Sequence, residues 1–144
     1  MPDPATENSR RIVTEFGTRF AAGDLSVFED LVAPDFVNHA AGPQGRNGWR
    51  STFEHLRRDL GDFTIEHHHV LADGDQAAVH LTLRGRHVAS TMPLLTDVPV
   101  TGAAVEWTFL HLFRIEDDRI AEHWACRDDV GLLRQLGAWP PSGT

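Results

Sequence analysis

The sequence predicts an α+β domain in which three N-terminal helices pack against a curved antiparallel sheet. Apolar residues recur at spacings of three and four as far as Leu60, and at every second residue from Asp62 onward. The chain of 144 residues has the length of one domain, and its 41% of hydrophobic residues is enough for one packed core. We expect a single domain over 1–144, with residues 1–8 and 138–144 loose.

Glycine and proline residues divide the helical part. The first helix ends near Gly23, after four apolar positions that share one face: Ile12, Val13, Phe16 and Phe20. A short second helix follows and ends before Pro34. A third helix begins near Asn47 and ends at Gly61. The segment between the second and third helices, including residues 36–39, is predicted to be irregular.

Four strands and a short last helix complete the predicted fold. The turn Asp73-Gly74-Asp75 joins the first two strands as a hairpin. A loop over Ser90–Gly102 contains two prolines and separates the second strand from the third. The last two strands, Ala104–Ile115 and Arg119–Arg127, meet at a tight turn over residues 117–118. Strands that follow one another in this way predict an antiparallel meander.

Charge and composition exclude several classes of function. The formal net charge is −8, and no basic stripe offsets it, so nucleic acid and anionic membranes are poor partners. No apolar run approaches the ~20 residues of a membrane span, and no signal peptide is recognisable, so we expect a cytoplasmic protein.

The residue types that are missing limit the chemistry further. All 13 cationic residues are arginine, which excludes lysine Schiff bases and the P-loop. There is no tyrosine, and the single cysteine, Cys126, excludes an internal disulfide and a cysteine-rich zinc site. We expect Cys126 to serve packing. Proton chemistry must therefore use carboxylates, histidine, this thiol or water.

Side chains alternate along a strand, so strand parity predicts which polar residues share the apolar face. On the first strand His67 and His69 lie with Ile65, and His68 points the other way. The second strand places His87 on the apolar face, and the third places His111 there with Trp107, Phe109 and Phe113. On the last strand, the face that carries the apolar Ile120 is predicted to carry Glu122, Trp124, Cys126 and Asp128 as well. We expect these groups to converge on one interior pocket.

Each of these residues also has a simpler interpretation. A single histidine on an apolar face is commonly a hydrogen-bonded core residue. Histidines 67–69 could ligate zinc or iron, but no established metal motif accompanies them, and we expect neither a metal nor a cofactor. Asp128 could cap the last helix, although Asp129 fits that cap as well and would leave Asp128 free.

Several short motifs, in order along the chain from about residue 10 to 137, resemble the SnoaL-like polyketide cyclases. The front half contributes Asp35–His39, Gly45-Arg46, Ala72–Asp75, Gly85–His87 and Pro99–Gly102. The most specific stretch comprises Phe113–Ile115, Arg119–Trp124, Asp128 and Leu132–Gly137. The resemblance implies an NTF2-like cone, in which a curved sheet and its helices enclose a pocket. It also implies ring closure of an aromatic polyketide by intramolecular aldol addition, without metal or organic cofactor.

The resemblance also implies site residues. A pocket aspartate serves the family as acid/base, and Asp128 fits its Trp-x-x-x-Asp pattern, while His39 and His87 fit its Asn-His and Gly-x-His positions. The chain departs from the family where Ala125 and Cys126 stand, since many relatives carry an acid there. It also has Gly-Arg-His in place of the more usual Gly-Thr-His. The superfamily's epoxide hydrolases and ketosteroid isomerases need residues that this chain lacks.

These inferences predict a cofactor-free cyclase for a small hydrophobic polyketide-like substrate. One of three histidines, His39, His87 or His111, removes the proton, and Asp128 protonates the acceptor carbonyl. Asn38 or an imidazole stabilises the enolate oxygen. The remaining expected substrate contacts are His67, His69, Trp107, Phe109, Phe113 and Trp124.

Two other functions remain open at this stage. A cycloaddition-type closure would depend on the aromatic walls alone, and a non-catalytic binding module would bind ligand without product. The second face of the sheet carries mixed polar residues that suit a homodimer interface: His80, Thr82, Arg84, Glu106, Thr108 and Arg114.

Overall fold

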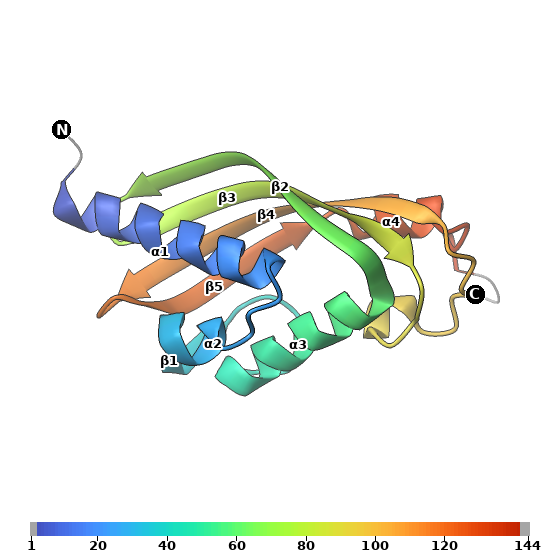
Figure 1. The fold of residues 1–144 in the computed structure, drawn as a ribbon, viewed down its shortest axis with the longest axis horizontal. Coiled ribbons are helices and arrows are strands. Elements are labelled where there is room, and N and C mark those ends of the chain that lie inside the picture. The colour runs from blue at the N-terminus through green and yellow to red at the C-terminus, as the bar shows by residue number, and fades with distance from the viewer. Residues whose placement is uncertain (1–2, 142–144) are drawn as a thin grey trace.

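The computed structural model describes residues 3–141 and has the predicted α+β layout (Figure 1). Three helices, α1, α2 and α3, lie on one side of a five-stranded curved sheet, and α4 follows the last strand. The bounds are α1 Pro4–Ala21, α2 Val27–Leu31, β1 Val32–Asn38, α3 Gly45–Asp59, β2 Leu60–Asp73, β3 Gln76–His87, a 3₁₀ turn Pro93–Leu95, β4 Ala104–Glu116, β5 Arg119–Arg127 and α4 Asp129–Gln135. In this part of the chain no helix combines the length and the apolar character that a membrane span requires.

The sheet has the order β1-β5-β4-β3-β2, and β2 to β5 form the predicted antiparallel meander. The prediction was wrong at one edge, because the segment expected to be irregular is strand β1. It pairs parallel to β5, with Asn38 opposite His123. Hydrogen bonds to a distant strand create this element, which local sequence cannot indicate. Pro34, which has no N–H to donate, is tolerated because β1 is an edge strand.

The N-terminal segment is more ordered than the sequence indicates. Residues 4–8 were expected to be loose, but α1 begins at Pro4. The Asp3 carboxylate accepts a hydrogen bond from the Thr6 N–H at 2.8 Å, and proline suits the first helical turn. At the other end Ala138 still donates to the Leu133 carbonyl at 2.8 Å. The expectation for residues 1–2 and 142–144 lies outside the described residues.

A β-bulge in β2 reverses the predicted orientation of its last residues. His67 pairs with Leu81, but His69 pairs with His80, so His68 is an additional residue in the ladder. His67 faces the helices as predicted. His69 lies on the outer face, where its Nδ1 is 3.0 Å from Nδ1 of His80. Leu71 follows it outward and is 65% exposed.

A second bulge reverses most of β5. Ile115 pairs with Ile120 while Arg114 pairs with Glu122, so Ala121 is the additional residue. Ile120 therefore faces the core as predicted, but beyond the bulge the inward residues are His123, Ala125 and Arg127 rather than Glu122, Trp124, Cys126 and Asp128. β3 and β4 keep a regular register with each other, and their predicted inward residues are all buried apart from Gly85, which is partly exposed.

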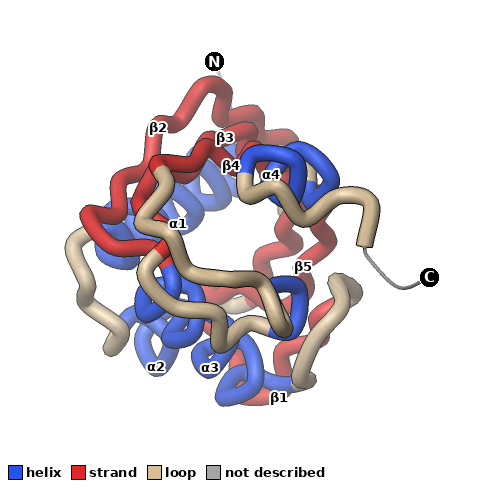
Figure 2. The backbone as a smooth tube through the Cα atoms, turned by 90° about the vertical axis from the view of Figure 1, so that its right-hand side faces the viewer, coloured by secondary structure: helices blue, strands red, loops and turns tan. Residues whose placement is uncertain are grey.

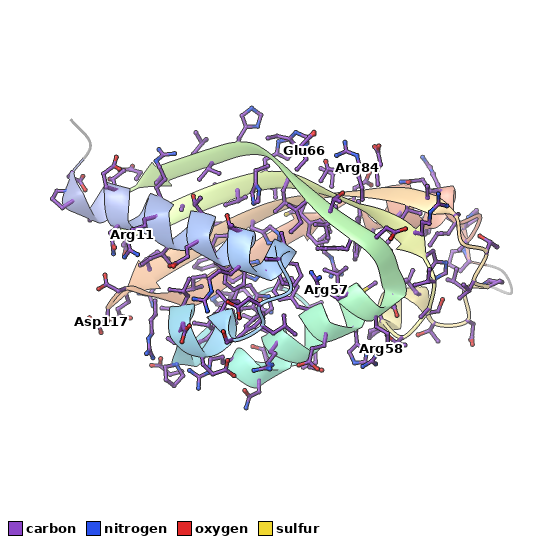
Figure 3. All side chains as sticks on the ribbon, viewed as in Figure 1. Arg11, Arg57, Arg58, Glu66, Arg84 and Asp117 are labelled. Carbon is purple, nitrogen blue, oxygen red and sulfur yellow. The ribbon has the colours of Figure 1, made fainter. Side chains whose placement is uncertain are left out.

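The outer face of the sheet is polar, as the parity of β3 and β4 predicts. Arg84 lies 3.5 Å from Glu66 and 3.2 Å from Glu106, so one guanidinium joins three strands. Figure 3 shows Glu66 and Arg84 on the side of the sheet away from α3. Arg114 and Glu122 form a similar pair at 2.5 Å.

The helices close the concave face through an aromatic core centred on Trp49 of α3. Its ring stacks on Phe16 of α1 at 5.0 Å and on Phe36 of β1 at 4.6 Å, measured between ring centroids. Phe28 of α2 meets the same indole edge-on at 5.6 Å. One buried indole thus joins three helices and an edge strand over the sheet.

A fully buried carboxylate holds the long loop over residues 88–103 against α3. Asp59 is 0% exposed and ends α3. Its oxygens accept from the Thr91 N–H at 2.9 Å, the Thr91 hydroxyl at 2.6 Å and the Met92 N–H at 2.8 Å. Carboxylate oxygens accept hydrogen bonds without donating, so all three donors depend on this one group.

We predict that Asp59→Asn lowers the free energy of unfolding by about 2–4 kcal/mol, because the amide NH₂ would face donors in a buried site. Urea denaturation measures the change. The matched control is Asp62→Asn, at an exposed position with a positive φ that asparagine also adopts, and it should stay within about 0.5 kcal/mol of wild type. Equal stability of the two variants would contradict the anchoring role.

Candidate active site

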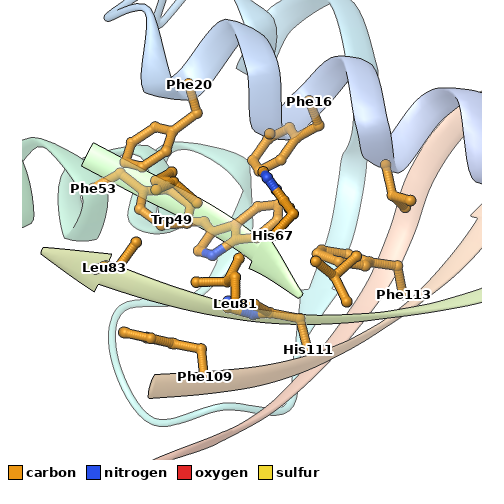
Figure 4. Close-up of a pocket in the computed structure, with 14 residues that line it drawn as sticks. Phe16, Phe20, Trp49, Phe53, His67, Leu81, Leu83, Phe109, His111 and Phe113 are labelled. Atoms are coloured by element: carbon orange, nitrogen blue, oxygen red, sulfur yellow. The ribbon is translucent and has the colours of Figure 1, made fainter. Parts of the chain in front are cut away.

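A small apolar cavity of about 40 Å³ lies between the helices and the concave face of the sheet. Figure 4 shows aromatic rings from α1, α3 and β4 around it, with two imidazoles among them. Among the described residues that line it, His67 and His111 carry imidazoles and Trp49 carries an indole N–H, and the rest are apolar. The lining residues are Val13, Phe16, Gly17, Phe20, Trp49, Phe53, Ile65, His67, Val79, Leu81, Leu83, Phe109, His111 and Phe113. We call this the inner cavity.

A chain of three side chains connects the inner cavity to strand β1. His111 Nδ1 lies 2.7 Å from His123 Nε2, and His123 Nδ1 lies 2.9 Å from Asn38 Oδ1. Asn38 Oδ1 also accepts from the Ala40 N–H at 3.0 Å, which identifies it as the amide oxygen. All three side chains are buried.

The direction of these hydrogen bonds fixes both tautomers. The amide oxygen only accepts, so His123 Nδ1 carries the proton. In a neutral ring its Nε2 then accepts, and His111 Nδ1 must donate. His111 Nε2 is left with an unshared pair on the ring that lines the inner cavity. The arrangement supplies a neutral imidazole base.

Burial keeps both imidazoles neutral. Loss of solvation lowers the pKa of His111 to about 4, and the charges of Arg127 and His67 add to this effect. Burial, then His111 and His39, lower the pKa of His123 to about 2. His111 is thus unprotonated at neutral pH.

His67 joins the inner cavity to solvent. Its pKa is also lowered, first by partial burial and then by the neighbouring His68. A methyl group on Gly17 of α1 would lie 2.8 Å from His67 Nε2, so the glycine leaves the space that the imidazole needs. The His67 side chain remains partly exposed and can exchange protons with water.

Seven of the eleven site residues predicted from the sequence lie outside the lining of the inner cavity: Asn38, His39, His69, His87, Trp107, Trp124 and Asp128. His39 is exposed, with Nε2 2.7 Å from Glu122 Oε2, and it stacks on Trp124 at 4.6 Å. His69 is on the outer face because of the bulge in β2. His87 is fully buried, and its Nε2 lies 2.7 Å from the Ser90 hydroxyl, at the start of the 88–103 loop.

Asp128 is the N-cap of α4, so its carboxylate is not free. Its carboxylate accepts from the Gly131 N–H at 2.9 Å at the start of α4, and the residue is exposed on the outer side of the sheet. Asp129, expected to be the cap, instead accepts from Trp107 Nε1 at 3.2 Å and Arg127 Nη2 at 3.1 Å. The structure thus reverses the assignment of these two acids.

Of the predicted residues, the inner cavity gathers His67, His111, Phe109 and Phe113, while Trp107 lies beside it against Phe109 at 4.6 Å. The bulge in β2 leaves His67 on the inner face and His68 and His69 on the outer face, so the three imidazoles cannot bind one metal ion. Within residues 3–141 no group of three or more His, Cys, Asp or Glu has a metal-holding geometry.

Sequence reasoning missed the role of His123. Ile120 faces the core, and strict alternation of side chains from that residue places His123 on the outer face. One signal was available in the charge pattern. Arg114 was placed on the outer face, and the acidic Glu122 is its natural cross-strand partner. Glu122 on the outer face implies His123 on the inner face.

We predict that the free energy of unfolding falls as the pH decreases from about 6.5 towards 4. Below 6.5 the unfolded histidines bind protons that buried His111 and His123 do not, so acid favours unfolding, by up to ~1.4 kcal/mol per pH unit for each imidazole. Urea denaturation between pH 7.5 and 5.0 measures this slope. His123→Gln, which retains polar groups for Asn38 and His111, should make the slope shallower, whereas His80→Gln on the outer face should not. Identical slopes in all three proteins would refute the assignment.

Known proteins resemble this chain in sequence and in fold. The sequence model of the family described as SnoaL-like polyketide cyclase matches residues 10–136. Nogalonic acid methyl ester cyclase of Streptomyces nogalater is 32% identical over 84% of this chain and 92% of its own. The structure of IdmH from Streptomyces antibioticus, proposed to be a polyketide cyclase, is 31% identical with a TM-score of 0.78, covering 90% of this chain and 98% of IdmH. TsrD of Streptomyces laurentii has 25% identity and a TM-score of 0.80, covering 96% and 99%. The chain belongs to the SnoaL-like polyketide cyclase family.

Proposed function

We propose that this chain is a cofactor-independent polyketide cyclase that closes a ring by intramolecular aldol addition, with His111 as the general base. The observation that carries the proposal is the hydrogen-bonded chain from Asn38 through His123 to His111, which leaves a bare nitrogen on a ring of the inner cavity. Family membership and the names of the relatives support the reaction class.

The reaction balances with one proton that is taken and returned. His111 Nε2 removes a proton from a carbon between two carbonyl groups, and an enolate forms. The enolate carbon attacks a second carbonyl carbon of the same molecule, which makes the new C–C bond and an alkoxide. The alkoxide takes the proton back from the His111 imidazolium. A methylene between carbonyls is acidic enough for a weak base, and the low pKa of His111 makes its conjugate acid a good donor.

The other polar groups have supporting roles in this proposal. His123 and Asn38 act as positioning residues, because they fix the tautomer of His111 without lining the inner cavity. His67 exchanges protons between the cavity and solvent, or donates to the acceptor carbonyl. Asp128, occupied as a cap, has no part in the chemistry.

The substrate is a small, largely apolar polyketide that the aromatic walls fold for reaction. Orientation of reacting groups can contribute ~7–11 kcal/mol to lowering a barrier. The inner cavity of about 40 Å³ is smaller than the 300–1,000 Å³ typical of ligand pockets. Substrate entry therefore requires the side chains that line the inner cavity to move.

We predict that His111→Phe lowers turnover by ~10²–10⁴, since the base is lost while the ring shape is kept. Asp128→Asn should retain turnover within about threefold, because an amide oxygen still caps α4. His123→Gln should lower kcat more than it changes KM and should alter the pH profile, as expected for a positioning residue. The assay follows conversion of linear or partly cyclised poly-β-ketones by EDTA-treated protein, with products identified by mass spectrometry and NMR.

The outcomes separate the remaining possibilities. Full activity in His111→Phe would replace the acid/base mechanism with shape-driven closure, which truncation of Phe109 or Phe113 would then abolish. Loss of activity in Asp128→Asn, with the fold intact by circular dichroism, would return Asp128 to the chemistry. Ligand binding without product for every candidate would favour a binding module.

We further propose that residues 1–144 form one domain, that the protein works in the cytoplasm, and that it forms a homodimer through the outer face of the sheet. Two exposed leucines on that face support the dimer: Leu71 of β2 is 65% exposed and Leu110 of β4 is 52% exposed. A monomer gains little from exposing such side chains together.

Size-exclusion chromatography with light scattering tests the dimer. We expect twice the 16.0 kDa mass of one chain for wild type, and a monomer for Leu110→Glu, because a carboxylate would be buried at the interface. Val100 is equally exposed, at 51%, but lies in the 88–103 loop, so Val100→Glu should remain a dimer. A monomeric wild type would contradict this proposal.

A further inference from the structure

A second cavity of about 260 Å³ lies next to the inner cavity, at the end of the cone where β3 leads into the 88–103 loop. Its walls come from the loop before α3, from α3, from the 88–103 loop, and from β4 and β5. Figure 2 views the backbone from this end, with β5, α4 and the loops nearest the viewer. We call it the outer cavity.

The outer cavity contains a cation held in a fixed position. The bulge at Ala121 turns Arg127 to the concave side. Its Nη2 donates to Asp129 Oδ2 at 3.1 Å, and its guanidinium lies 5.5 Å from the centre of the Trp107 ring. Trp107 Nε1 also donates to Asp129, so the three side chains hold one another in place.

Most of the hydrogen-bonding capacity of Arg127 is unused. Among residues 3–141 its one side-chain hydrogen-bond partner is Asp129, which occupies one of its five N–H groups. The side chain is 29% exposed, so the remaining donors are accessible. A planar guanidinium with free donors matches a carboxylate, which accepts two parallel hydrogen bonds.

The opposite wall offers an acceptor. The Thr91 hydroxyl donates to Asp59, so it must accept from His55 Nδ1, which lies 3.0 Å away. In a neutral ring, His55 Nε2 is then left as an acceptor, which suits a hydroxyl group of a ligand. Met92, Pro93 and Leu94 make the rest of this wall largely apolar.

A pair of adjoining aromatic rings links the linings of the two cavities. Trp107 lines the outer cavity and Phe109 lines the inner one, with ring centroids 4.6 Å apart. The charge of Arg127 also acts on His111, where it helps to lower the pKa of the imidazole. A ligand anchored at Arg127 would have to pass these rings to reach His111.

We propose that the outer cavity binds a carboxylate at one end of the substrate and that Arg127 determines this specificity, so that the chain prefers a free acid to its methyl ester. The inference rests on the proposed function, since it assigns the far end of that substrate. It differs from what the names of the related methyl ester cyclases say of their own substrates.

The test is a binding titration that needs no turnover. Anthraquinone-2-carboxylate and its methyl ester cannot undergo aldol closure, and each is titrated against the fluorescence of the tryptophans, of which Trp107 lines the outer cavity. We expect the acid to bind wild type at least tenfold more tightly than the ester. The net charge of −8 repels anions, so such a preference must be local.

Variants assign the preference to one residue. Arg127→Gln should weaken binding of the acid about tenfold and change binding of the ester less than twofold, and Arg127→Lys should lie between. Arg11→Gln removes an equal charge from α1, far from the site, and should behave as wild type. Equal binding of acid and ester by wild type, or an unchanged ratio in Arg127→Gln, would overturn the inference.

Turnover assays distinguish this inference from the proposed function. Acid preference without ring closure of any poly-β-ketone would contradict the cyclase proposal and retain the role of Arg127. Ring closure of methyl esters in preference to free acids would retain the cyclase and overturn the role of Arg127.

Discussion

The burial of two imidazoles between β4 and β5 is the constraint on which the rest of this structure depends. Removed from water, His111 and His123 are neutral at neutral pH in the resting protein, and each needs a hydrogen-bond partner. The two imidazoles are hydrogen-bonded to each other, and His123 is also hydrogen-bonded to the Asn38 amide. Because the amide oxygen only accepts, it determines which nitrogen of each imidazole carries the proton. One nitrogen remains unsatisfied, on a ring that lines the inner cavity.

Two irregular features of the fold serve this arrangement. Strand β1 joins the sheet in parallel at the β5 edge, which sets Asn38 opposite His123. The bulge at Ala121 turns His123 and Arg127 inward and leaves Glu122 to pair with Arg114 outside. Trp49 then covers the chain from the helix side, with its ring 4.8 Å from that of His123. Water is excluded by packing, and the hydrogen-bond chain remains intact.

The carboxylates near the cone have structural positions in this arrangement. Asp59 holds the 88–103 loop, Asp128 caps α4, and Asp129 orients Arg127 and Trp107. The inner cavity is left with aromatic walls and two neutral imidazoles. Such a site handles protons without fixed charge, and the fixed cation lies in the neighbouring cavity. The division suits a substrate with an apolar reacting chain and an anionic end.

The sequence alone determined the element types apart from β1, and it determined the family. It also determined the inward residues of β3 and β4, because those strands pair without a bulge and alternation holds along them. It also indicated His67 and His111. Only the tertiary structure decided the positions of His69, His123, Arg127 and Asp128, and the existence of β1. A bulge is one additional residue whose place depends on the partner strand and on the curvature of the closed sheet, and an edge strand depends on a neighbour far along the chain. The local sequence pattern indicates neither the bulges nor the edge strand, since both form only when distant segments of the chain pair.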